Sequence, residues 1–251
     1  MRRRVAAPAI RLAGLLFAAA IAPAPGAPPA PADCRVPAEL ARVEAKLSGL
    51  RARVAAGGPL TIIAIGDAST AGIKVGGADL AYPHWLQEAL ARAWPGRPVT
   101  VVNKGVAHQS TEEMLARFGP DVIAARPALA IWETGIVDAV QNTETEDFAT
   151  ALRSGIDMLH RRGVDVVLMD MQFSRKATAL VDFGRYLDAI HQVGEVNGVY
   201  VFPRYAMMRY WNEEHMFDLD ARSQKEEAAV AAAVYRCIGH RLAAAIVEAT
   251  Q

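Results

Sequence analysis

Short apolar segments alternate with helical patterns along most of this chain, and this alternation constrains the possible folds more than any other feature. Apolar runs of strand length cover residues 60–66, 99–103, 128–133, 164–170 and 199–202. Apolar residues at helical spacing predict helices over residues 82–93, 111–118, 146–162, 177–196 and 225–250. Continuously apolar strands joined by helices are typical of βαβ units, whose helices bury both faces of a parallel sheet. We therefore predict an α/β fold, a three-layer, doubly wound, flavodoxin-like sheet of five parallel strands.

The beginning of the chain has the pattern of an export signal. Three arginines follow Met1, the segment 12–21 is apolar but too short to span a bilayer, and Ala30-Pro31-Ala32 resembles a cleavage site. These features predict a signal peptide over residues 1–32 and a mature protein that is periplasmic or secreted. A lipoprotein anchor is disfavoured because Asp33, rather than a small residue, precedes Cys34. We therefore expect no stable membrane anchor after cleavage.

Two parts follow the predicted signal. An amphipathic helix that packs outside the main fold is predicted within residues 33–58, because apolar residues recur there at helical spacing, namely Leu40, Val43, Leu47 and Leu50. Residues 59–251 form the main domain, which contains every predicted strand.

Charge and composition narrow the class of partner. Without residues 1–32 the chain has 23 basic and 27 acidic residues, so its net charge is negative. This balance disfavours nucleic acids and anionic membranes as partners. The sequence offers no ligand spacing typical of a metal site, and no motif in it indicates a cofactor.

The chain has two cysteines, and both lie after the predicted signal. Cys34 would stand at the mature N-terminus and Cys237 lies in the last predicted helix. An even number of cysteines in an exported protein favours a disulfide, which would pin a terminus that otherwise frays. The alternative is two unrelated thiols, with Cys237 simply buried in the core.

Polar and glycine-rich sequences follow four of the predicted strands. They read Gly66-Asp67-Ala68-Ser69, Asn103-Lys104-Gly105, Glu133-Thr134-Gly135 and Asp170-Met171-Gln172. In a doubly wound sheet the carboxyl ends of the strands meet at one edge, where ligands bind. The four segments together therefore predict a functional site at this edge.

These segments resemble the sequence blocks of the SGNH/GDSL hydrolase family, over roughly residues 60–250. The run Gly66-Asp-Ala-Ser-Thr-Ala-Gly72 matches the first block, residues 99–105 match the second, and Gly135-Ile-Val-Asp138 corresponds to the third. In that family the first block supplies a nucleophilic serine, whose backbone N–H also contributes to the oxyanion hole. Here the serine position holds Ala68, whose methyl group cannot attack a carbonyl.

The same resemblance implies roles for other residues. Gly105 occupies the position of a second oxyanion donor, and Val137 stands where the family has an asparagine donor. The family also carries an Asp-x-x-His pair near its C-terminus. Asn212-Glu-Glu-His215 has that spacing, with asparagine at the aspartate position, and it lies before the last helix.

Ser69 is the one hydroxyl next to the altered position. One residue along a helix start rotates a side chain by about 100°, so we expect the Ser69 hydroxyl, with Thr70, to cap the following helix. The alternative is a displaced nucleophile at Ser69 that uses His215 or His108 as its base. Asp67 is expected to be part of a polar rim or to cap the turn.

Three functions remain open at this point. The first is an exported, catalytically impaired SGNH-like protein that binds a glycan or an acyl ester in the former active-site cleft. The second is a working esterase that uses Ser69, and the third is a structural partner in an envelope assembly. Two further segments are candidates to border the cleft: residues 172–176, with their charges, and residues 207–211, with their aromatic side chains.

Overall fold

The computed structural model describes residues 34–220 and 223–251, so the predicted signal peptide lies outside the described residues. Its single sheet has the order β2-β1-β3-β4-β5, and every neighbouring pair is parallel. The strands are β1 (Leu60–Gly66), β2 (Val99–Gly105), β3 (Leu129–Glu133), β4 (Asp165–Met169) and β5 (Tyr200–Phe202). The predicted five-stranded, flavodoxin-like sheet is therefore confirmed.

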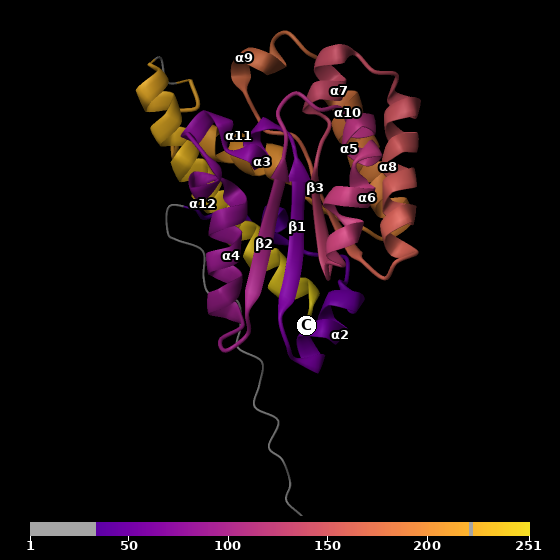
Figure 1. Ribbon diagram of the computed structural model, residues 1–251. Helices are drawn as coiled ribbons and strands as arrows, with labels where there is room; N and C mark the ends of the chain where they lie inside the picture. The colour runs from indigo at the N-terminus through magenta and orange to yellow at the C-terminus, as the bar shows by residue number, and fades with distance from the viewer. Residues whose placement is uncertain (1–33, 221–222) are drawn as a thin grey trace, which may run out of the picture.

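Helices cover both faces of this sheet and complete three layers (Figure 1). One face packs against α2 (Ser48–Ala56), α4 (Tyr82–Ala93), α11 (Arg204–Glu213) and α12 (Gln224–Ala249). The other packs against α5 (Thr111–Ala116), α6 (Phe118–Asp121), α8 (Thr145–His160) and α10 (Gly184–Asn197). Alternate residues of each strand point to opposite faces, so Ile62 and Ala64 enter the first cluster while Ile63 and Ile65 enter the second.

Short elements complete the chain between these helices. They are α3 (Ala68–Ala71), η2 (Ile73–Val75), η3 (Ala78–Leu80), η4 (Ile123–Ala125), α7 (Ile136–Gln141) and α9 (Arg175–Thr178). Near the upper end of the molecule in Figure 1, α3, α9 and α11 lie where the strands end. This is the carboxyl edge at which the sequence places the site.

Two predicted helices are interrupted. The helix expected over residues 177–196 is divided into α9 and α10, because the Ser174 hydroxyl caps α9 and the Asp182 carboxylate accepts from the Gly184 N–H where α10 begins. The helix expected over residues 111–118 ends at Ala116, and α6 follows after Arg117. Local side-chain hydrogen bonds of this kind compete with continuous helix.

The single helix expected within residues 33–58 was also wrong in its continuity. It is replaced by α1 (Ala38–Ala41), an extended segment and α2. In the extended segment exposed residues alternate with Val43, Ala45 and Leu47, which is the period of a strand. The Leu47 N–H donates to the Ala249 carbonyl, and Asp165 accepts from the Leu50 N–H in the first turn of α2. A distant carboxylate therefore decides where this helix begins.

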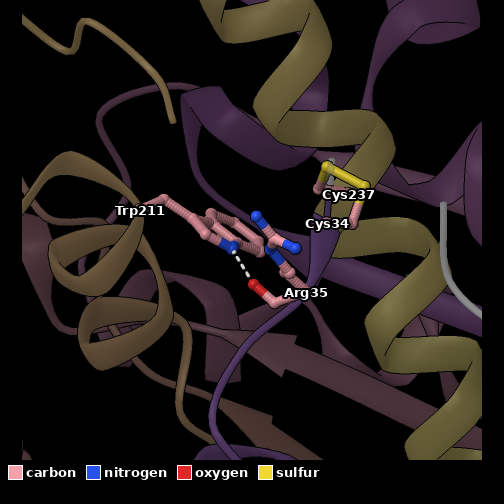
Figure 2. The surroundings of a disulfide bond; sticks show 4 residues. All are labelled: Cys34, Arg35, Trp211 and Cys237. Atoms are coloured by element: carbon pink, nitrogen blue, oxygen red, sulfur yellow. Dashed lines mark hydrogen bonds between the residues drawn. A yellow bond between two sulfur atoms is a disulfide. The ribbon is translucent and has the colours of Figure 1, made fainter. Parts of the chain in front are cut away.

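The predicted disulfide is confirmed. Cys34 and Cys237 are bonded, their Cα atoms are 5.0 Å apart, and both residues are fully buried (Figure 2). Beside the bridge, the Trp211 indole N–H donates to the Arg35 carbonyl at 2.9 Å. The start of the described chain is thereby attached to both α12 and α11.

One helix of the described residues, α12, is long and apolar enough to cross a membrane by length and composition alone. More than half of its most apolar window is buried inside the protein, and it carries Cys237. Its apolar character is accounted for by packing against α4 and the sheet.

Candidate functional site

The turn after β1 holds the altered nucleophile position. Asp67 is the N-cap of α3, and its Oδ1 atom accepts from the backbone N–H groups of Ala68 and His108. The expectation that Asp67 caps this turn is confirmed. Ala68 is half-buried and begins α3, so the strand–turn–helix setting of a nucleophile is present without a hydroxyl at the position that would carry it.

A buried ion pair lies beneath this turn. Arg204, at the start of α11, donates through Nη2 to Glu133 Oε1 at the end of β3, at 2.9 Å. The two side chains are only 2% and 1% exposed. The other oxygen of Glu133 accepts from the Asp67 N–H and from the Thr70 hydroxyl, both at 2.9 Å. One carboxylate therefore joins three separate segments of the chain.

Ser69 belongs to the same network. Its hydroxyl accepts from Arg204 Nη1 at 2.8 Å, and the residue is 5% exposed. The expectation that Ser69 and Thr70 cap α3 was wrong, because the Ser69 hydroxyl is bonded to Arg204 and that of Thr70 to Glu133. Among the described residues no histidine hydrogen-bonds to Ser69, so the geometry does not supply the hydroxyl with a base.

The three positions implied as oxyanion donors have other structural roles here. The Ala68 N–H is bonded to Asp67, and the Gly105 N–H donates to the Asn103 side chain at 2.9 Å. Val137, half-buried in α7, has no polar group on its side chain. Gly105 has a packing role as well: a Cβ atom there would lie 2.2 Å from the backbone nitrogen of Ala71. Two donors are thus engaged within the protein, and the third is replaced.

The two histidines proposed as bases are both exposed. His108 lies in the loop after β2 and contributes its backbone N–H to Asp67. His215 follows α11 and lines a pocket with Asn212 and side chains from the loop after β4. Both histidines have positive φ, 65° for His108 and 54° for His215. The structure therefore places His108 beside the rim at Asp67 and His215 in that pocket.

A second polar cluster follows β3. Asp138, buried in α7, accepts from the backbone and hydroxyl of Thr111, and that hydroxyl also lies 2.5 Å from the Thr134 hydroxyl. Gly135 is the N-cap of α7 with a φ of 101°, a backbone conformation that favours glycine. This cluster joins α5 to the end of β3 and fixes the loop that carries Val137.

Burial changes the acidities at this edge. It raises the pKa of Asp67, and the neighbouring charge of Glu133 acts in the same direction. It likewise raises the pKa of Asp138 above its ordinary value, against the hydrogen bonds from Thr111. The phenol of Tyr235 is also buried near this network, and its pKa is raised to about 12. These shifts indicate a desolvated polar interior beneath the edge.

Two residues that form ion pairs at the carboxyl edge were not predicted from the sequence. Arg204 follows β5 and gave no motif, although a buried glutamate at the end of a strand calls for a cationic partner. The second is His191 on α10, whose Nε2 lies 3.2 Å from Asp170 Oδ2 after β4. The Asp170 hydrogen bond raises the pKa of His191. His191 also lines a large groove beside β5, whereas Asp170 is buried.

Across residues 34–220 and 223–251, no group of three or more histidine, cysteine, aspartate or glutamate side chains is arranged to hold a metal ion. The buried carboxylates at the edge, those of Asp67, Glu133, Asp138 and Asp170, instead accept hydrogen bonds from side chains or from backbone N–H groups.

Comparison with known proteins agrees with this geometry. The model of the Non-GDSL lipase-like family matches residues 33–251. A search of curated proteins gave no significant match.

Solved structures share the fold at low sequence identity. A lipolytic protein of the G-D-S-L family from Desulfitobacterium hafniense DCB-2 is 17% identical, with a TM-score of 0.51, covering 70% of this chain and 98% of its own. Two variants of an acetyl xylan esterase from Geobacillus stearothermophilus are 19% and 20% identical, with TM-scores of 0.59, covering 77% of this chain and 95% of theirs. One of these is a catalytic mutant in which a serine is replaced by alanine.

Proposed function

The chain belongs to the Non-GDSL lipase-like family, an SGNH-like hydrolase scaffold, and on that premise we propose that it is a catalytically impaired member which binds a glycan ester or another acyl ester without hydrolysing it. We further propose that it acts after export, in the periplasm or outside the cell. The observation that carries the first proposal is the combination of Ala68 with the Ser69 hydroxyl held by buried Arg204.

The missing nucleophile has the largest consequence for the chemistry. Acyl transfer on this scaffold needs a hydroxyl that a base can deprotonate within hydrogen-bond reach. Ser69 accepts a hydrogen bond from a guanidinium, which cannot remove a proton and which holds the hydroxyl inside the protein. Loss of the nucleophile in a comparable hydrolase costs about 10⁶ in rate.

The oxyanion positions add to this loss. In an active site the donors must be free to bind the oxygen on which charge develops, and removal of one donor costs about 10²–10³ in rate. Here the N–H groups of Ala68 and Gly105 are bonded to neighbouring side chains, and Val137 offers no donor. The family's nucleophile is therefore replaced, and the groups that would stabilise the transition state are engaged elsewhere or replaced as well.

The proposal that this chain binds an ester is supported by the fold that it shares with known esterases, and not by its catalytic groups. The structurally similar acetyl xylan esterase acts, by its name, on an acylated polysaccharide. A glycan ester is accordingly the ligand class that we propose for this chain. Export is supported by the export-signal pattern of residues 1–32 and by the Cys34–Cys237 disulfide, which is typical of oxidising compartments.

Labelling with a fluorophosphonate probe, together with p-nitrophenyl acetate hydrolysis, tests the proposal directly. We expect no labelling of the purified protein comprising residues 33–251. Its hydrolysis rate should equal that of the Ser69→Ala variant. An active acetyl xylan esterase serves as the positive control. Labelling or a rate that disappears in Ser69→Ala would establish the alternative, a working esterase with a displaced serine.

Ligand binding needs a separate measurement. Titration of the ¹⁵N-labelled protein with acetylated xylo-oligosaccharides should shift the amide signals of the carboxyl edge, including Ala68, Gly105 and His108. Shifts confined to other surfaces, or none at millimolar ligand, would contradict binding at this edge.

A further inference from the structure

A pocket of about 380 Å³ lies between the loop after β4 and the end of α11. It is lined by Phe173, Arg175, Asn212, Glu213, His215, Phe217, Asp218 and Asp220. Of the two segments that the sequence suggested as borders of a cleft, residues 172–176 contribute Phe173 and Arg175 to this pocket, whereas none of residues 207–211 lines it. The opposite wall comes from residues 212–220, at and after the end of α11. The Asp170 carboxylate, directly after β4, accepts from the Tyr205 N–H at the start of α11 at 2.7 Å and so attaches the loop after β4 to this helix.

Two aromatic side chains form fixed walls of this pocket. Phe173 packs edge-on against Tyr205, with ring centroids 5.4 Å apart, and Phe217 packs edge-on against Trp211 at 5.7 Å. Trp211 is fully buried and anchored through its indole N–H to the Arg35 carbonyl (Figure 2). Rings held in this way lose little conformational entropy when a ligand stacks on them.

The polar lining offers both donors and acceptors. The Arg175 guanidinium lies 3.3 Å from the Asp220 carboxylate on the rim of the pocket. Within the described part of the chain, the side chains of Asn212 and His215 make no hydrogen bond. An amide and an imidazole at a pocket wall can each donate and accept, so they are available to a ligand.

The chemistry of the lining excludes several ligand classes. Three carboxylates, from Glu213, Asp218 and Asp220, disfavour an anion. An acyl chain would desolvate the charged and amide groups of the lining without pairing them, which disfavours that ligand. The described residues hold no metal-binding group. A neutral polyol fits this lining, because its hydroxyls pair with carboxylates and amides while its C–H faces stack on aromatic rings.

We propose that this pocket binds a neutral saccharide. The proposal rests on the proposed function in one respect: it specifies the glycan part of the ligand and assigns it to the pocket at His215 rather than to the turn at Ala68. His215 then serves as a hydrogen-bonding group for sugar hydroxyls instead of a base for Ser69.

Calorimetric titration of the mature protein with xylotetraose, cellotetraose and chitotetraose tests this assignment. We expect at least one of these neutral oligosaccharides to bind. Phe217→Leu, which keeps apolar packing on Trp211 but removes the ring, should weaken that binding about tenfold. Asn212→Ala, which removes the amide, should weaken it about three- to tenfold.

Matched controls separate the pocket from the rest of the molecule. His215→Gly removes the imidazole and tolerates the positive φ, whereas His160→Ala removes an exposed histidine from α8. The first variant should weaken binding and the second should leave it unchanged. Circular dichroism and thermal unfolding of each variant show whether it is folded.

Three results would overturn the proposal. They are the absence of binding of all three oligosaccharides at millimolar concentration, binding that Phe217→Leu and Asn212→Ala leave unchanged, and binding only of a cation such as spermine. Esterase activity that depends on Ser69 would refute catalytic impairment but would leave the pocket result standing. The two proposals therefore fail separately.

Discussion

The turn at Ala68 and the pocket at His215 are both built from segments that follow strands of the same sheet, yet their polar groups are used in opposite ways. At the turn, Glu133, Arg204 and Ser69 are almost completely buried and bonded to one another. At the pocket, Asn212 and His215 face solvent-accessible space. The polar groups behind the family's nucleophile position are thus bonded to one another inside the fold, whereas those of the pocket are open to solvent.

Removing one member of the buried ion pair gives the strongest test of whether the polar groups at the turn stabilise the fold. Arg204→Met leaves Glu133 charged and unpaired in the interior, and we expect the free energy of unfolding to fall by about 3–5 kcal/mol. Urea denaturation followed by circular dichroism measures the change. Arg209→Met, in the exposed pair with Glu213, is the matched control and should cost under about 1 kcal/mol. Equal effects in the two variants would show that the turn is not held by Arg204.

The disulfide lies beside Arg35, which is bonded to α11, the helix that ends at the pocket. Replacing both Cys34 and Cys237 by alanine should lower the free energy of unfolding by about 2–5 kcal/mol, because the bridge closes a loop of 203 residues in the unfolded chain. Hydrogen exchange should increase more in α11, which contacts Arg35 beside the bridge, than in β1. Uniform exchange across both elements, or two free thiols in mass mapping of the purified protein, would contradict this prediction.

The pair of His191 and Asp170 makes stability depend on pH near the start of α11. The folded-state pKa of His191 is raised, so its contribution is fully present below the ordinary histidine pKa and is lost as the pH rises through the raised value. Because the His191 side chain is 49% exposed, we expect the loss to stay below about 1 kcal/mol. Unfolding measured between about pH 5 and pH 9 should lose this dependence in His191→Gln. A dependence that persists in that variant would assign it to other groups.

The smallest expected effect comes from restoring two family residues. Ala68→Ser with Val137→Asn supplies a hydroxyl and an amide, but among the described residues no histidine is bonded to the neighbouring Ser69 and the Gly105 N–H remains engaged by Asn103. We therefore expect p-nitrophenyl acetate hydrolysis to stay within about tenfold of the unaltered protein. A rate gain of 10³ or more that His215→Gly abolishes would show that His215 reaches the turn and that only two groups were missing.

Much of the fold could be predicted from local sequence. The strands were predicted because continuously apolar segments satisfy a doubly covered parallel sheet, and α4 was predicted to its exact ends, Tyr82 and Ala93. The altered position at Ala68 was equally visible, because a missing hydroxyl is a property of one residue. The disulfide was favoured by the even number of cysteines together with the export-signal pattern, and the structure decided it against two separate thiols.

Other features required the tertiary structure. The N-terminal helix is interrupted because Leu47 bonds to Ala249 and α2 begins at the carboxylate of Asp165, both far away in the sequence. The role of Ser69 could not be predicted because its partner, Arg204, is 135 residues away.

Sequence by itself thus determined the layers of the fold and the absence of a serine at the family's nucleophile position, since both depend on side-chain type and short-range periodicity. Only the tertiary structure decided which polar groups satisfy one another and which remain open to a ligand. The physical reason is that the hydrogen bonds of buried polar groups are formed between whichever segments folding brings together, and no local pattern records that pairing.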